Sequence, residues 1–242
     1  ADRPDQSAFW EYFADGFDRL GLSRLTATYF SESEPVNRTD LTAGGHVTTT
    51  PLESNGDFRS PECAAIMAEA DLVSTNPPFS LQREFIGQVA TSGKDFLTMA
   101  SLDALSYREV FDLFREDRIR TGVHWGNMVF SVPEEYAGMR GAFTDADGGL
   151  WYRQNNTLWL TNLTHDAPRG VELSATYDPE RYPAFDNYAA IEVPRVENIP
   201  KDYDGVMGVP ISYLLRHDPA QFQIVGITRG WDDGSGFKTK HY

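Results

Sequence analysis

The stretch that most constrains the fold is Asp71-Leu72-Val73-Ser74-Thr75-Asn76-Pro77-Pro78-Phe79-Ser80. A short apolar run at residues 72–73 leads into Asn-Pro-Pro-Phe, and an amphipathic run follows over residues 81–89. This order predicts a strand, a turn and a helix, with the turn at the carboxyl end of the strand, where open α/β sheets bind ligands. Two consecutive prolines fix φ and restrict the residues before them, so the turn is expected to be stiff.

This turn carries groups that suit an exocyclic amino group. The Asn76 side-chain oxygen and the Pro77 carbonyl are two acceptors for its N–H bonds, and the Phe79 ring offers a flat surface for a base. The turn has no strong base at neutral pH, so it suits an electrophile that is already activated, such as S-adenosylmethionine. The alternative is an ordinary Pro-Pro loop, because a four-residue motif also occurs by chance.

Asn-Pro-Pro-Phe resembles the catalytic motif of N6-adenine methyltransferases, and the wider sequence resembles the EcoRI-type adenine-specific DNA methyltransferases. Similar blocks run in order over nearly the whole chain: Phe9-Trp10-x-Tyr12-Phe13, Leu20-Gly21-Leu22, Gly56-Asp57-Phe58-Arg59-Ser60, residues 70–80, Tyr182-Pro183-x-Phe185-Asp186-Asn187-Tyr188 and residues 199–210. The resemblance implies a Rossmann-like, S-adenosylmethionine-dependent methyltransferase fold of the α/β class. It also implies catalytic roles for Asn76, Pro77, Pro78 and Phe79.

The resemblance further implies a cofactor site. In related methyltransferases an acidic residue at the place of Asp57 accepts from the adenine amino group of the cofactor, and an apolar neighbour, here Phe58, covers the ring. No Gly-x-Gly loop occurs before residue 25. The family carries an acidic-proline segment there, which the N-terminal tetrapeptide resembles, so Asp2 and Pro4 are assigned to the cofactor site. Glu32 is the candidate for the ribose hydroxyls, and whether upstream residues complete the site is left open.

The order of expected elements indicates a parallel α/β sheet. Helices are expected at residues 7–20 (with Ser7 as N-cap and Gly21 as stop), 61–69, 81–89 and 107–114, and strands at 24–30, 46–49, 71–75, 96–100, 118–123, 128–132 and 223–228. The composition changes after about residue 140. We therefore expect a methyltransferase core over 1–140 and a loop-rich C-terminal part over 141–242, which completes the sheet and carries target-recognition loops.

The net charge of −15 argues against a nucleic-acid binder, which usually has a basic face. Formal charge does not locate a patch, however, so the acids can lie away from a local DNA-binding cleft. Residues 151–162, rich in aromatic and amide side chains, either contact bases or pack as a β-hairpin. Candidate phosphate contacts, or members of a solvated face, are Arg153, Arg169, Arg181 and Arg195.

Several classes of site are not expected. Cys63 is the one cysteine, which excludes an internal disulfide and a cysteine metal cluster and favours a reducing cytoplasm. The five histidines are scattered without metal-ligand spacing, so no metal is expected. The chain shows no apolar run long enough for a membrane span and no export signal.

The expected function is site-specific transfer of a methyl group from S-adenosylmethionine to N6 of an adenine flipped out of double-stranded DNA, in restriction–modification or in phage or host DNA modification. One alternative is a catalytically impaired methyltransferase-like protein that binds DNA or a protein partner. Another is a glutamine N-methyltransferase of proteins, since Asn-Pro-Pro turns also orient side-chain amides. The recognition sequence and the oligomeric state are left open.

Overall fold

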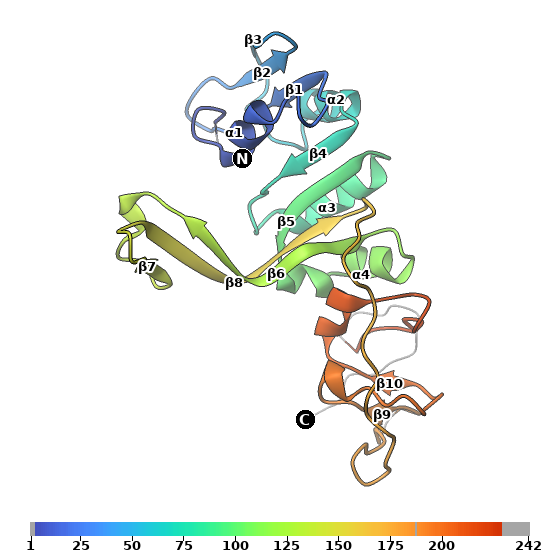
Figure 1. The fold of residues 1–242 in the computed structure, drawn as a ribbon. Coiled ribbons are helices and arrows are strands. Elements are labelled where there is room, and N and C mark those ends of the chain that lie inside the picture. Colours follow the sequence, from blue (N-terminus) through green and yellow to red (C-terminus); the bar gives the residue numbers. More distant parts are fainter. Residues whose placement is uncertain (1–2, 187, 229–242) are drawn as a thin grey trace. The chain divides into compact units, whose positions relative to one another are not determined.

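The computed structural model describes residues 3–186 and 188–228, which fall into two compact units, Ala1–Met99 and Ala100–Tyr242 (Figure 1). Helices and strands alternate in a mixed α/β arrangement, which confirms the expected class at that level. The elements are α1 (Ala8–Asp15), β1 (Arg24–Ala27), β2 (Asn37–Thr42), β3 (His46–Pro51), α2 (Pro61–Glu69), β4 (Leu72–Thr75), α3 (Gln82–Thr91), β5 (Asp95–Ser101), η1 (Leu102–Ser106), α4 (Arg108–Arg115), β6 (Arg120–Ser131), η2 (Glu134–Tyr136), β7 (Ala142–Thr144), β8 (Leu150–Thr161), β9 (Ile191–Glu192), η3 (Val196–Asn198), β10 (Met207–Gly208) and η4 (Ile211–Arg216).

The first unit contains the predicted strand, turn and helix. β4 and β5 pair in parallel, from Leu72 opposite Asp95 to Thr75 opposite Thr98, and α3 connects them. The buried residues of α3 recur at helical spacing: Gln82, Phe85, Ile86 and Val89. Phe85, Ile86 and Val89 form the apolar part of this stripe, which packs one face of the helix against the core. The strand–turn–helix prediction is therefore confirmed, with boundaries shifted by one or two residues.

An antiparallel sheet of order β1-β2-β3 also lies in this unit. Residues 37–42, where no strand was expected, form β2. Polar residues such as Asn37 and Asp40 disguise a strand whose alternate members Thr39 and Leu41 are buried. The hairpin to β3 turns through Gly44 and Gly45, whose φ values of 81° and 75° favour glycine.

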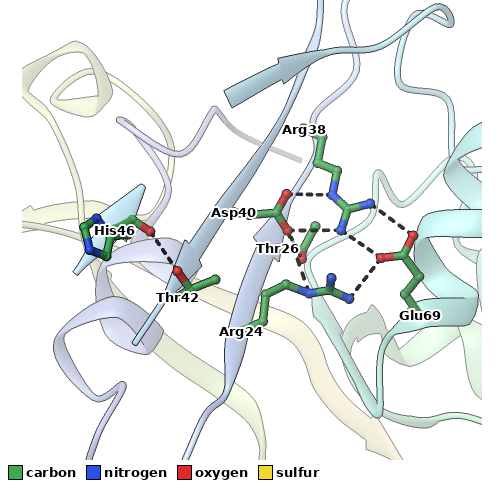
Figure 2. A network of polar contacts seen from close by, with 7 residues as sticks. All are labelled: Arg24, Thr26, Arg38, Asp40, Thr42, His46 and Glu69. Carbon is green, nitrogen blue, oxygen red and sulfur yellow. Dashed lines mark hydrogen bonds and ion pairs between the residues drawn. The ribbon is translucent and has the colours of Figure 1, made fainter. Parts of the chain in front are cut away.

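A polar network attaches this sheet to α2 (Figure 2). Arg38 of β2 lies 2.7 Å from Asp40 and 2.8 Å from Glu69 at the end of α2, and Arg24 of β1 lies 2.9 Å from the same Glu69 oxygen. Thr26 donates a 2.6 Å hydrogen bond to Asp40. Burial alone would raise the pKa of Asp40, but the bonds from Arg38 and Thr26 outweigh it and hold that pKa below its usual range. The network therefore keeps both carboxylates charged and ties strand to helix.

The N-terminal helix is shorter than expected. Ser7 caps α1 as predicted, with its Oγ accepting from the Trp10 N–H at 3.4 Å. The helix ends at Asp15 with Gly16 as C-cap, so Gly21 is not the stop. Gly16 is buried, and an added Cβ would lie 2.9 Å from Leu20, which favours glycine at this end.

The second unit is built on a long antiparallel pair. β6 and β8, each of 12 residues, lie side by side, and β7 pairs with the first three residues of β8, residues 150–152 (Figure 1). The expectation of parallel strands is therefore wrong for residues 120–161. The two strands expected at 118–123 and 128–132 are one irregular strand, because Gly126, with φ of 83°, interrupts the alternation without ending the pairing.

The C-terminal part packs around its own apolar cluster, which includes Val171, Tyr182, Ile191, Val193, Val196, Ile199 and Tyr213. Tyr182 is 1% exposed and donates to the Asn198 carbonyl at 2.9 Å, so it is a packing residue. The strand expected at 223–228 is wrong, since these residues have no regular structure. The chain just before residue 223 is bonded to Val171 through Gln221. The Gln221 side chain accepts from the Val171 N–H and donates to the Val171 carbonyl, each at 2.8 Å. Among the described residues, no helix has the length and hydropathy of a membrane span.

Candidate active site

The Asn-Pro-Pro-Phe loop begins where β4 ends. The Thr98 hydroxyl of β5 donates a 3.2 Å bond to the carbonyl of Thr75, the last residue of β4, and thereby fixes the start of the loop. A second bond of 2.9 Å, from the Leu81 N–H to the Pro78 carbonyl, closes the turn before α3. The loop is thus anchored at both ends by hydrogen bonds, in addition to the constraint from its prolines.

The groups expected to bind the substrate are available within this loop. Asn76 is exposed and Phe79 half-buried, whereas Pro77 is buried. In residues 3–186 and 188–228, neither the Asn76 amide nor the Pro77 carbonyl is occupied by a hydrogen bond. The exposed Asn76 amide can therefore meet an incoming amino group, and neither acceptor has to give up a bond within the described chain.

The Gly56-Asp57-Phe58 segment forms a tight loop against the chain that follows β1. Gly56 has φ of 78°, and an added Cβ would fall 1.8 Å from the Tyr29 carbonyl oxygen, so only glycine fits. Both Asp57 oxygens are bound by Arg59: Oδ1 accepts from its backbone N–H at 2.9 Å, and Oδ2 lies 2.6 Å from its guanidinium. These bonds, the side-chain one foremost, hold the pKa of Asp57 below its usual range. Asp57 is therefore a charged, oriented acceptor.

Phe58 lies between two neighbours. Its ring meets Phe85 of α3 edge-on, with the centroids 5.4 Å apart, and the Arg59 guanidinium carbon lies 5.6 Å from its centroid. Gln88 of α3 donates a 3.0 Å bond to the Phe58 carbonyl. The helix that follows the Asn-Pro-Pro-Phe loop therefore also supports the segment assigned to the cofactor.

The other cofactor candidates gather partly at the same place. The Ser31 N–H donates to the Asn55 carbonyl at 3.1 Å, so the chain next to the exposed Glu32 is bonded to the chain that leads into the Asp57 loop. Arg3, next to the half-buried Pro4, lies 3.4 Å from Glu34 and 5.9 Å from the Tyr29 ring centroid. Asp2 lies outside the described residues.

Two supporting residues were missed in the sequence. Arg59 lies in a block that resembles the family, and its spacing of two from Asp57 is typical of a local side-chain turn, so this signal was present. Thr98 had no such signal, because its role depends on the register that sets it opposite Thr75. No group of histidine, cysteine and acidic residues in the described part of the chain could hold a metal.

The comparisons with known proteins bear on the whole chain. The family described as "Adenine-specific methyltransferase EcoRI" matches residues 1–242. The chain belongs to this family. Membership confirms the expectation of a site-specific DNA adenine methyltransferase, and a methyltransferase requires a methyl donor.

Curated members of the family resemble the chain over most of its length. It is 37% identical to "Type II methyltransferase M.EcoRI" of Escherichia coli, over 96% of this chain and 78% of that protein. It is 35% identical to "Type II methyltransferase M.MpnI" of Mycoplasma pneumoniae, over 91% of this chain and 71% of the relative. No solved structure matches the chain.

Proposed function

We propose that this enzyme transfers a methyl group from S-adenosylmethionine to N6 of a specific adenine in double-stranded DNA, within a Rossmann-like methyltransferase core. The observation that carries the proposal is the anchored Asn76-Pro77-Pro78-Phe79 loop with its free amide and carbonyl. Residues 1–140 would form the core and residues 141–242 the part that recognises the target. Restriction–modification is the proposed setting, since the relatives' names are those of type II methyltransferases.

In the proposed mechanism the target adenine leaves the base stack, at a cost of a few kcal/mol. Its N6 amino group donates one N–H to the Asn76 side-chain oxygen and one to the Pro77 carbonyl, while Phe79 stacks on the ring. This arrangement turns the nitrogen lone pair away from the turn. Asn76 and Pro77 would hold N6 in place while a bound donor supplies its methyl group, and N6 would release one proton to solvent as the demethylated donor leaves. The rate enhancement would come from the positioning of the adenine against the donor and from the polar groups that surround N6.

The residues assigned to the donor fit an adenosyl group. Asp57 is ionised and half-buried, so it can accept from an amino group, and Phe58 offers an apolar ring beside it. A bound donor supplies a methyl group activated by its positive sulfur. The chain's own residues have only to bind it, hold it in line with N6 and exclude water.

The test is methylation of unmethylated DNA of mixed sequence, with N6-methyladenine measured by mass spectrometry after digestion. We expect N6-methyladenine from the wild type and at least about a hundredfold less in the same time from Asn76→Ala. A control reaction offers glutamine-containing peptides in place of DNA. Methylation of the peptides but not of the DNA would contradict the proposal and favour the glutamine methyltransferase. If titration calorimetry shows that the donor binds but neither substrate is methylated, the chain is the catalytically impaired methyltransferase-like protein.

A further inference from the structure

The ribbon formed by β6 and β8 has an irregularity made of asparagines. Gly126 pairs with Thr157 and Met128 with Gln154, so the single residue Asn127 lies opposite two residues, Asn155 and Asn156. This two-against-one pairing is a β-bulge, a feature that re-aims side chains and is common beside functional sites.

The amide groups at this bulge are exposed. Asn127, Asn155 and Asn156 are all solvent-exposed. Asn156 donates to Asp103 at 3.5 Å, while in the described part of the chain the side chains of Asn127 and Asn155 make no hydrogen bond. The fold therefore does not use the latter two amides. Solvation alone would account for one such residue, but less readily for two at a single bulge.

The same face of the ribbon continues with residues that suit a nucleic acid. Val129 and Arg153 pair directly beyond the bulge, both are exposed, and strand alternation puts them on the face of Asn127 and Asn155. Val129 is 44% exposed, so its methyl groups are available on this face. The Arg153 guanidinium lies 5.2 Å from the Phe143 ring centroid, which steadies it.

The charge of the ribbon contrasts with that of the chain. Neither 12-residue strand contains an aspartate or glutamate, although 36 of the 242 residues are acidic. The strands do contain arginines, at Arg120 and Arg153. Strands without carboxylates repel phosphates less, and the Asp103 carboxylate that lies beside the bulge is bonded to Asn156 at 3.5 Å. Each strand is roughly 40 Å long, enough to cross a major groove about 12 Å wide.

We propose that the exposed face of the β6–β8 ribbon, centred on the asparagine bulge, enters the major groove of the DNA duplex and reads the recognition sequence. Asn127 and Asn155 are specificity-determining residues that pair with the N6 and N7 edge of adenines, for which asparagine amides are well matched. Val129 contacts thymine methyl groups and Arg153 a backbone phosphate. The inference rests on the proposed function and assigns the part of it that selects the sequence.

The experiment compares Asn155→Ala and Asn127→Ala with wild type on mixed-sequence DNA, with methylated positions read by single-molecule sequencing. We expect each variant to relax the preference at one position of the site by about ten- to a hundredfold while still methylating adenine, since one base contact is lost. Gln154→Ala, an amide variant on the opposite face of the same ribbon, is the matched control and should keep the wild-type site. Melting curves verify that each variant folds.

A second variant tests the approach of the ribbon to phosphates. Asn127→Asp keeps the shape and adds a negative charge, so DNA binding, measured by fluorescence anisotropy at low salt, should weaken more than tenfold while donor binding is unchanged. The inference would be overturned if both alanine variants kept the wild-type activity and methylated the same sites. It would also be overturned if Asn127→Asp changed the oligomeric state, because the face would then bind a second copy of the chain. Absence of methylation by the wild type would instead overturn the proposed function.

Discussion

The guanidinium of Arg59 lies 2.6 Å from the Asp57 carboxylate and stands over the Phe58 ring, with its carbon 5.6 Å from the ring centroid. One cation thus engages both residues that are assigned to the adenine of the methyl donor. The adenine amino group must therefore either share the carboxylate with Arg59 or displace it. Substitution of Asp57 and of Arg59 in turn therefore tests whether this carboxylate binds the adenine of the donor.

Asp57→Ala is expected to weaken donor binding by about 1.5–3 kcal/mol, because a charged acceptor for the adenine amino group is lost. DNA affinity should not change. Titration calorimetry measures the affinity for the donor, and fluorescence anisotropy measures the affinity for DNA. Arg59→Ala is the control, and it should alter donor affinity less than Asp57→Ala does, since the acceptor remains. If donor binding survives Asp57→Ala intact, the Gly-Asp-Phe loop is only structural.

Asn76→Ala is expected to lower the methylation rate by at least about a hundredfold, comparable to removing one preorganised polar group from a transition state. Donor affinity should stay near that of the wild type, because the amide acts on the target base. Single-turnover methylation and donor titration separate the two effects. An equal loss in both would place Asn76 in the donor site and contradict its role at N6.

Phe79→Ala is expected to weaken capture of the flipped adenine by ~1–3 kcal/mol, the range for stacking of a base on an aromatic ring. The comparison should use duplexes with a mismatched or abasic partner opposite the target adenine, where flipping costs less. Phe79→Tyr preserves the ring and should bind as the wild type does. Equal affinities for Phe79→Ala and wild type would exclude stacking.

Thr98→Val removes the hydroxyl that fixes the start of the Asn76 loop while preserving side-chain shape. Loss of the 3.2 Å bond to the Thr75 carbonyl should cost about 0.5–1.5 kcal/mol of stability. Because the hydroxyl acts through the loop, kcat should fall while KM for DNA stays the same. Thr49→Ala on the exposed strand β3 is the control for a threonine without such a role. A variant with unchanged kcat would show that the prolines alone fix the turn.

The sequence predicted the elements whose pattern is local. Residues 61–69 match α2, which begins at Pro61, a residue favoured at the first position of a helix whatever packs around it. The turn after β4 was likewise predicted, since Pro77 and Pro78 restrict the backbone whatever packs around them.

The incorrect predictions concern elements whose structure depends on contacts with residues distant in the sequence. β2 was missed because Arg38 and Asp40 are stabilised in the strand by partners on β1 and α2, and no local pattern reveals these. The strand direction at β6 and β8 depends on long-range pairing, and the bulge at Asn127 hides the alternation. The roles of the individual site residues stay predictions, to be decided by the experiments above.

The His217 side chain is buried, with 7% of the residue exposed. Burial lowers the pKa of its imidazole below the ordinary value near 6.5, and it outweighs the bond to the Phe222 carbonyl at 3.2 Å, which acts in the opposite direction. In the unfolded chain the imidazole takes up a proton at higher pH than in the folded protein. The free energy of unfolding contributed by His217 is therefore complete above about pH 6.5 and is lost as the pH falls through the folded pKa.

We expect the free energy of unfolding, from urea titrations between pH 7.5 and 5, to fall toward the acidic end of this range. His217→Gln, which keeps a donor for the Phe222 carbonyl but does not titrate, should flatten the dependence. The window lies above the range in which Asp40 and Asp57 protonate, because the pKa of each is held below its usual range. A slope that persists unchanged in His217→Gln would assign the effect to other groups and contradict the role of the buried imidazole.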